Sequence, residues 1–153
     1  QQGEIVSFDT DMVGPYGYCA DISRTFVCGN KFNNNQKALY SMSLEQINHN
    51  SNLIKADMSF REFTEKSWKL PEEYYGNRYS VMVHGIGLCD EWPSIRYPTD
   101  GGDKSGRFLK NMTITVESYI GKVGGKEGVK LEQQYLVGEN GLELMSHHPL
   151  ENI

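Results

Sequence analysis

The sequence predicts an α+β domain, because segments typical of strands lie at both ends of the chain and helical segments lie between them. The outer segments are rich in aromatic and β-branched residues, whereas the middle contains apolar residues at helical spacing. The chain has 153 residues, 38% of them hydrophobic and 23% charged. This composition suffices for one packed domain.

The predicted strands occupy five segments. Residues 3–9 and 16–27 form the first two, joined by a turn at Gly14-Pro15-Tyr16-Gly17. Residues 112–120 and 129–137 form the next two, separated by a glycine-rich turn, and residues 142–145 form a short last strand. Residues 82–88 are expected to be extended, and residues 93–109 are expected to form a loop rich in Gly, Pro and Asp.

Two helices are predicted between the strands. The first spans residues 33–56, where an Asn cluster offers an N-cap and Leu39, Met42 and Ile47 share a stripe. The second spans residues 60–69. Its N-cap is Ser59, its capping-box partner is Glu62, and Pro71 follows its end.

Composition excludes several function classes. Fifteen Lys and Arg residues against twenty Asp and Glu residues give a net charge of −5, which excludes a general nucleic-acid binder. No apolar run approaches the ~20 residues of a membrane helix, so no membrane partner is expected. Three cysteines without metal-finger spacing favour a reducing, cytoplasmic location.

The chain also looks like part of a longer protein. It opens with Gln1 rather than Met, and a strand pattern begins almost at once. We therefore expect residues 1–153 to be a partial catalytic, metal-binding domain, preceded in the whole protein by an N-terminal domain and the start of the catalytic domain.

Acidic residues in strands are the most informative anomaly, because carboxylates are depleted there and are costly to bury unpaired. These are Asp9, Asp11, Asp21, Glu117 and Glu132. Several carboxylates that face one core repel each other unless cations compensate, and a pair of divalent metal ions does so directly. His84, in the string Val-His-Gly-Ile-Gly, adds an imidazole to the candidate ligands.

Four strings together resemble one superfamily. The chain resembles the methionine aminopeptidase, prolidase and creatinase superfamily in these strings: FDTDMVGPYGYCADISRTF, HGIGL with EWP, TVES and GVKLEQQYLV. The resemblance implies a pita-bread fold, of which this chain would be the C-terminal portion, and a dinuclear metal site. The implied ligands are Asp9, Asp11, Asp21, His84, Glu117 and Glu132.

The sequence departs from the peptidases of that superfamily at three places. The spacing that peptidases keep between their two aspartates would place the first at Thr10, which lies between Asp9 and Asp11. Asp90 replaces the second histidine of the peptidase string, which here is one residue shorter, and Ser118 follows Glu117 where proline is usual.

These departures resemble the DddP-type dimethylsulfoniopropionate lyases. The resemblance implies three aspartate ligands, two iron ions, a homodimer of the full-length protein and dimethylsulfoniopropionate as the small-molecule substrate. Residue types alone do not select iron, because sites of carboxylate and imidazole also accept Mn, Co or Zn.

The chemistry of such a lyase requires a base and a site for a cation. We expect Asp90 to be the general base, with Glu91 as the alternative, because desolvation raises a carboxylate pKa toward the working pH. Tyr79 and Trp92 are expected to bind the substrate through their aromatic faces, and Tyr79 also to act in catalysis.

Two other functions compete with a lyase. A proline-specific metallopeptidase, either an Xaa-Pro aminopeptidase or a dipeptidase, would need a second histidine near His84. A binding module without catalysis would have lost metal ligands. Among the remaining residues, Arg24 is expected to pair with ligand carboxylates, and His49, His147 and His148 to be exposed.

Overall fold

The protein is built on an antiparallel sheet of five strands in the order β6-β5-β7-β8-β9. The computed structural model describes residues 1–29, 31–102 and 104–150. The sheet consists of β5 (Val81–Gly85), β6 (Ser94–Arg96), β7 (Thr113–Gly121), β8 (Gly128–Val137) and β9 (Leu142–Leu144). The predicted mixture of helices and strands is confirmed.

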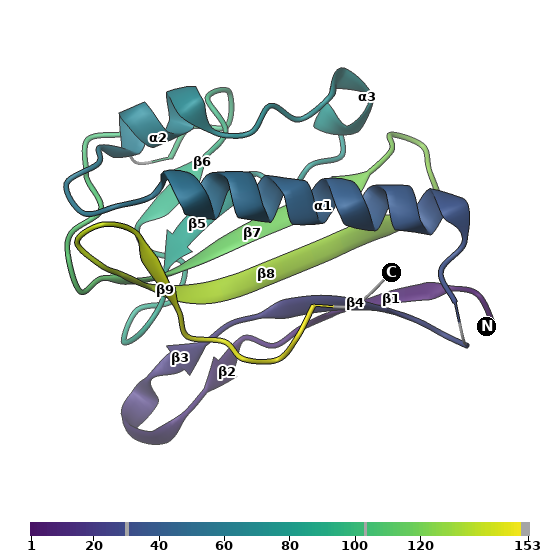
Figure 1. Cartoon of the computed structure of the whole chain (residues 1–153), viewed down its shortest axis with the longest axis horizontal. Helices are drawn as coiled ribbons and strands as arrows, with labels where there is room; N and C mark the ends of the chain where they lie inside the picture. The colour runs from purple at the N-terminus through teal and green to yellow at the C-terminus, as the bar shows by residue number, and fades with distance from the viewer. Residues whose placement is uncertain (30, 103, 151–153) are drawn as a thin grey trace.

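A helix and a ribbon of two strands cover the two faces of this sheet (Figure 1). α1 (Asn34–Leu53) lies against β7 and β8 on one face. The antiparallel ribbon of β1 (Ile5–Asp9) and β4 (Ser23–Val27) lies against β8 on the other. Residues 114–118 of β7 are therefore buried whichever way their side chains point.

The apolar core lies between α1 and the sheet. Ile47 of α1 and Val116, Ile120 and Leu131 of the sheet are fully buried. Ser118 Oγ donates to Gln46 Oε1 of α1 at 2.6 Å, which fixes the helix relative to β7. The alternate positions of β7, including Glu117, consequently face the β1–β4 ribbon.

A group of phenylalanines extends this core beyond α1. Phe60 and Phe63 of α2 (Phe60–Lys66) meet Phe108 edge to face, with ring centres 4.9 and 5.7 Å apart. Ser59 caps α2 by accepting a hydrogen bond from the Glu62 main-chain N–H at 3.1 Å, as the sequence predicts.

The predicted strand over residues 16–27 is wrong as a single element. The segment divides into η1 (Pro15–Gly17), β3 (Cys19–Ala20) and β4, and β3 pairs with β2 (Met12–Val13). Thr10 Oγ1 accepts a hydrogen bond from the Ile22 N–H at 3.0 Å and donates to the Ile22 carbonyl at 3.2 Å. The Thr10 side chain thus takes the place of main-chain hydrogen bonds between the β1–β4 ribbon and the β2–β3 hairpin. The hairpin projects beyond the sheet (Figure 1).

Other element boundaries also differ from the predictions. α1 ends at Leu53 rather than at residue 56, because Ile54 turns extended and enters the core. α2 ends at Lys66 rather than at residue 69, and a short α3 (Glu72–Tyr75) follows. The predicted loop over residues 93–109 contains β6, which forms because β5 offers it a pairing edge. No helix in the described ranges is long and apolar enough to cross a bilayer.

Apolar side chains gather on the outer side of the β1–β4 ribbon and on the β2–β3 hairpin. Those that are exposed are Val6, Phe8, Met12, Val13, Tyr16, Tyr18 and Phe26. Exposed apolar side chains gathered in this number are typical of a face that another part of a protein covers.

The start of α1 provides a test of local stability. Asn33 accepts a hydrogen bond from the Gln36 N–H, and the Gln36 side chain accepts one from the Asn33 N–H, both at 2.9 Å. Asn33→Ala should lower the free energy of unfolding by about 1 kcal/mol, because the Gln36 N–H in the first turn of α1 loses its acceptor. The exposed neighbour Asn34→Ala is the control and should not destabilise. Urea unfolding of the full-length protein measures both, and equal effects would contradict the capping role.

Candidate metal centre

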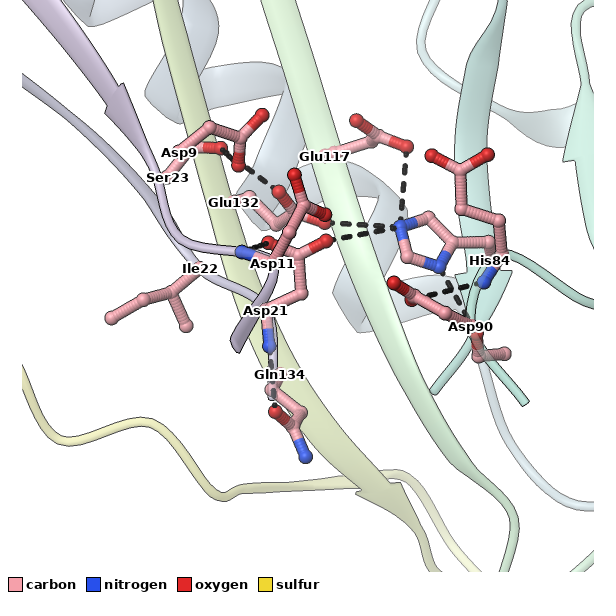
Figure 2. Close-up of polar contacts among 12 residues, drawn as sticks. Asp9, Asp11, Asp21, Ile22, Ser23, His84, Asp90, Glu117, Glu132 and Gln134 are labelled. Carbon is pink, nitrogen blue, oxygen red and sulfur yellow. Dashed lines mark hydrogen bonds and ion pairs between the residues drawn. The ribbon is translucent and has the colours of Figure 1, made fainter. Parts of the chain in front are cut away.

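The six predicted metal ligands come together from five parts of the fold (Figure 2). Glu117 of β7 and Glu132 of β8 are direct cross-strand partners, and His84 lies on β5, the other neighbour of β7. The three aspartates come from the ribbon: Asp9 ends β1, Asp11 follows it, and Asp21 precedes β4.

His84 Nε2 is the point at which three carboxylates converge (Figure 2). It lies 3.2 Å from Glu132 Oε1, 3.7 Å from Glu117 Oε1 and 3.8 Å from Asp21 Oδ2. His84 Nδ1 lies 3.0 Å from the Gly85 carbonyl oxygen, which can only accept, so Nδ1 carries a proton. Nε2 is therefore the nitrogen that can bind a cation, once its own proton has left. Ligand atoms of Asp21, His84 and Glu132 all lie within 4.8 Å of one another.

The ribbon aspartates are held by local hydrogen bonds. Ser23 Oγ lies 2.6 Å from Asp9 Oδ1 and 2.9 Å from Glu132 Oε2, and so links β1 to β8 through β4. The Asp11 N–H points to Asp21 Oδ1 at 3.5 Å. Asp11 has a φ of 32°, a left-handed conformation that turns the chain at the end of β1.

Crowding of negative charge dominates the electrostatics. Burial and the neighbouring charges of Glu132, Asp9 and Asp11 raise the pKa of Asp21 to about 8. Burial and Glu132 raise the pKa of Glu117 to about 8, against the opposing effect of Lys130.

Cationic partners act in the opposite direction at Glu132 and His84. Burial opposes ionisation of Glu132, but hydrogen bonds and charges from His84, Lys130 and Ser23 hold its pKa below the usual value. Burial opposes protonation of His84, yet Glu132 and Glu117 raise its pKa to about 9. The site therefore attracts cations.

The donor set fits divalent metal ions. Glu117 Oε1 is buried and has no hydrogen-bond partner among the described residues. An unpartnered buried carboxylate oxygen is costly unless a cation binds it. Carboxylate oxygens with one imidazole nitrogen are ligands that Fe, Mn, Co and Zn accept.

A cavity of about 530 Å³ opens onto this cluster. Five of the six predicted ligands line it, all except Glu132, and the other lining residues are Ser7, Asn77, Arg78, Tyr79, Glu91, Tyr119 and Lys130. The Tyr79 hydroxyl donates to Glu91 Oε1 at 3.3 Å. Burial, Glu117 and Glu91 together raise the pKa of Tyr79 to about 12, so it stays protonated.

The structure places the two other predicted residues outside the cavity lining. Asp90 is half-buried, and its Oδ1 accepts a hydrogen bond from the Glu91 N–H at 3.0 Å (Figure 2). Trp92 is 62% exposed. Glu91 has a φ of 56°, so the backbone is strained where it passes the cavity mouth.

Gly85 lets this loop pass close to His84. A Cβ at Gly85 would stand 2.1 Å from the Trp92 carbonyl oxygen, so only glycine fits there. The sequence reasoning that glycines beside His84 allow a close backbone approach therefore agrees with the structure at Gly85.

Sequence reasoning missed Lys130 and Ser23. Lys130 stands two residues before Glu132 on β8, and the strand period of two could have placed both on one face. Ser23 gave no signal, because its role depends on β4 crossing β8.

The expectation for Arg24 is wrong. Its donors bind main-chain carbonyls of Ser23, Glu132, His148 and Pro149 and the Gln133 side chain, rather than carboxylates. His49, His147 and His148 are exposed, as expected.

Fold and site together define an α+β domain with a candidate metal centre of acidic side chains and one histidine. Over residues 1–139 the chain matches the profile of metallopeptidase family M24, and it belongs to that family. The members of this family are enzymes that use divalent metals.

The relatives are longer than this chain, and the solved structure among them has the same fold. The dimethylsulfoniopropionate lyase DddP of Roseovarius nubinhibens is 37% identical over 99% of this chain and 34% of its own length. That of Roseobacter denitrificans is 36% identical over the same shares. The Xaa-Pro dipeptidase structure from Bacillus anthracis is 31% identical, with a TM-score of 0.76 over 100% of this chain and 42% of that one. The pita-bread fold is thereby confirmed, and the chain spans about a third of the length of these curated relatives.

Glu117 provides the sharpest test of the metal centre. Glu117→Gln keeps the shape of the side chain but removes the charge, so the full-length protein should lose metal affinity at least about tenfold. Elemental analysis after equilibrium dialysis measures the bound metal. Glu143→Gln, an exposed change on β9, is the matched control. Full metal stoichiometry in Glu117→Gln would refute the ligand role.

Proposed function

We propose that the protein is a dimethylsulfoniopropionate lyase, which releases dimethyl sulfide and acrylate by β-elimination. One observation carries the proposal: three aspartates, Asp9, Asp11 and Asp21, line a cavity in which His84 is the one histidine among the described lining residues. A peptidase of this fold would need a second histidine donor, and the other three histidines of the described chain are exposed. The 37% and 36% identities to two lyases support the same choice.

We propose two divalent ions as cofactors, with iron as the metal. Asp9, Asp11, Asp21, His84, Glu117 and Glu132 would hold them. The ions would supply positive charge that binds the substrate carboxylate and stabilises the negative charge that develops as the α-proton leaves. The negative charge of the cavity and its unpartnered Glu117 oxygen support this cofactor.

The residues of the chain carry the proton transfer. A carboxylate base takes the proton from the carbon next to the substrate carboxylate. The electron pair of that C–H bond forms the double bond of acrylate, and the bond between the β-carbon and sulfur breaks. Sulfur keeps that bond's electron pair and leaves as neutral dimethyl sulfide, and the base later returns its proton to solvent.

Asp90 is the base that we propose, and Glu91 is the alternative. In the described conformation the Asp90 carboxylate binds the Glu91 N–H, whereas the Glu91 carboxylate lines the cavity and accepts from Tyr79. A catalytic role for Asp90 thus requires its carboxylate to turn from that N–H into the cavity, a change of side-chain rotamer in a half-buried residue. The two candidates are separable by mutation.

The sulfonium group needs a site for a cation. Tyr79 presents its ring to the cavity, and Lys130 Nζ lies 4.4 Å from the ring centre, so a cation already occupies this ring face. We propose that Tyr79 positions the substrate and that Trp92, which is exposed and two residues from Asp90, contributes its ring.

The chain alone does not make the whole enzyme in this proposal. We propose that residues 1–153 are the C-terminal portion of the catalytic domain, that an N-terminal domain precedes it, and that the full-length protein is a homodimer. The exposed apolar side chains of β1 and the β2–β3 hairpin support a covering partner. Three free cysteines suit a cytoplasmic enzyme.

Headspace gas chromatography tests the reaction. The full-length protein, reconstituted with ferrous iron, should release dimethyl sulfide from dimethylsulfoniopropionate and should leave an Xaa-Pro dipeptide intact. The metal-stripped protein is the control and should be inactive. Cleavage of the dipeptide without dimethyl sulfide release would establish a proline-specific metallopeptidase instead.

Substitution at the two candidate bases tests the mechanism. Asp90→Asn should lower turnover at least about a hundredfold, because the amide cannot accept the proton. Bound metal should be unchanged, since Asp90 is not among the proposed ligands. Glu91→Gln is the matched variant and should retain most turnover. If Asp90→Asn keeps near-normal turnover and Glu91→Gln loses turnover, Glu91 and not Asp90 is the base.

A further inference from the structure

Lys130 is a largely covered cation that contacts three members of the carboxylate cluster. Its Nζ forms a short contact with Glu117 Oε2 and lies 3.6 Å from Asp9 Oδ2 and 3.7 Å from Glu132 Oε2. The side chain is 12% exposed. Lysine side chains are rarely covered to this extent unless they are paired with acidic groups. Attraction to the three carboxylates therefore holds the Lys130 ammonium in place.

The fold fixes the position of this lysine. The Lys130 N–H donates to Thr25 Oγ1 at 3.0 Å, and Thr25 Oγ1 donates to the Lys130 carbonyl at 2.8 Å. Tyr119 is its cross-strand partner on β7. The main chain at Lys130 is thereby tied to both β7 and β4, and its side chain lines the cavity from this fixed position.

Charge balance gives the lysine a role. The five carboxylates carry five negative charges when ionised, and two divalent ions supply four positive charges. One negative charge remains, and one lysine matches it if His84 is neutral when metal binds. The other cation that lines the cavity, Arg78, is committed to Asp100, with its Nε 2.9 Å from Asp100 Oδ2.

We propose that Lys130 is the built-in counter-cation of the metal centre. It holds Glu117 and Asp9 together when metal is absent and competes with the incoming ion for Glu117. In the loaded site it remains beside Asp9 and the ring of Tyr79. This inference rests on the proposed metal centre and is independent of which substrate the enzyme cleaves.

Linkage sets the direction of the effect. Lys130 neutralises more carboxylate charge in the metal-free state than in the loaded state, where the ions take over Glu117 and Glu132. Removing the lysine therefore destabilises the metal-free protein more than the loaded one, and metal affinity must rise by the same difference. A residue that only packed against Tyr79 would destabilise both states alike.

The test compares Lys130→Met with Lys130→Arg in the full-length protein. Mn²⁺ affinity is measured by competition with a chelator, and melting temperature is measured with and without Mn²⁺. Lys130→Met should bind Mn²⁺ about tenfold more tightly or better, and its melting temperature should fall further without Mn²⁺ than with it. Lys130→Arg keeps the charge and should stay near wild type. Lys122→Met, which removes an exposed pairing with Glu73, is the matched control and should change neither quantity.

The outcomes separate this inference from the proposed function. Unchanged or weaker Mn²⁺ binding in Lys130→Met, with wild type binding two ions, overturns the role of Lys130 alone. Absence of Mn²⁺ binding in wild type overturns the metal centre itself. If Lys130→Met folds only with Mn²⁺ present, that dependence supports the proposal. If it does not fold in either state, Lys130→Gln is measured against the same expectations.

Discussion

Repulsion among five carboxylates is the constraint on which this structure depends. Asp9, Asp11, Asp21, Glu117 and Glu132 enter one small volume from the ribbon and the sheet. Like charges at such short distances repel each other and would push the ribbon away from the sheet, unless the scaffold is rigid and cations are present. The scaffold supplies rigidity through α1, whose contacts with β7 and β8 bury the opposite face of the same strands. Its own cations at this cluster are Lys130 and, when protonated, His84, and the proposed metal ions would balance the remaining charge.

The sequence predicted most reliably what strand periodicity determines. Glu117 and Glu132 were placed on the sheet because β7 and β8 are long and regular, and their register makes the two glutamates partners. The fold class followed from the order of strand and helix patterns. Residues 16–27 failed as one strand because Thr10 bonds both main-chain groups of Ile22, a contact between segments that no local pattern encodes.

The site was harder to predict where loops bring residues together. Asp90, Glu91 and Trp92 are consecutive in the chain, yet Glu91 lines the cavity while the Asp90 carboxylate binds the main chain. The left-handed φ of Glu91 and the close approach to Gly85 decide this arrangement, and neither follows from residue types. The position of Lys130, by contrast, could have been predicted, because the strand period of two places it on the same face as Glu132.

The same scaffold can serve hydrolysis or elimination because the charge requirement is shared. Both reactions need positive charge beside an oxygen of the substrate. They differ in what surrounds that charge: hydrolysis of a peptide uses a donor to the developing oxyanion, whereas elimination needs a base near a carbon-bound proton. The cavity is lined by one histidine and by Glu91 of the loop, and the ring of Tyr79 faces the Lys130 ammonium, an arrangement that supports the proposed elimination. Lys130 would then reconcile the extra aspartate with an otherwise neutral metal centre, so that the added carboxylate changes the chemistry without excess charge.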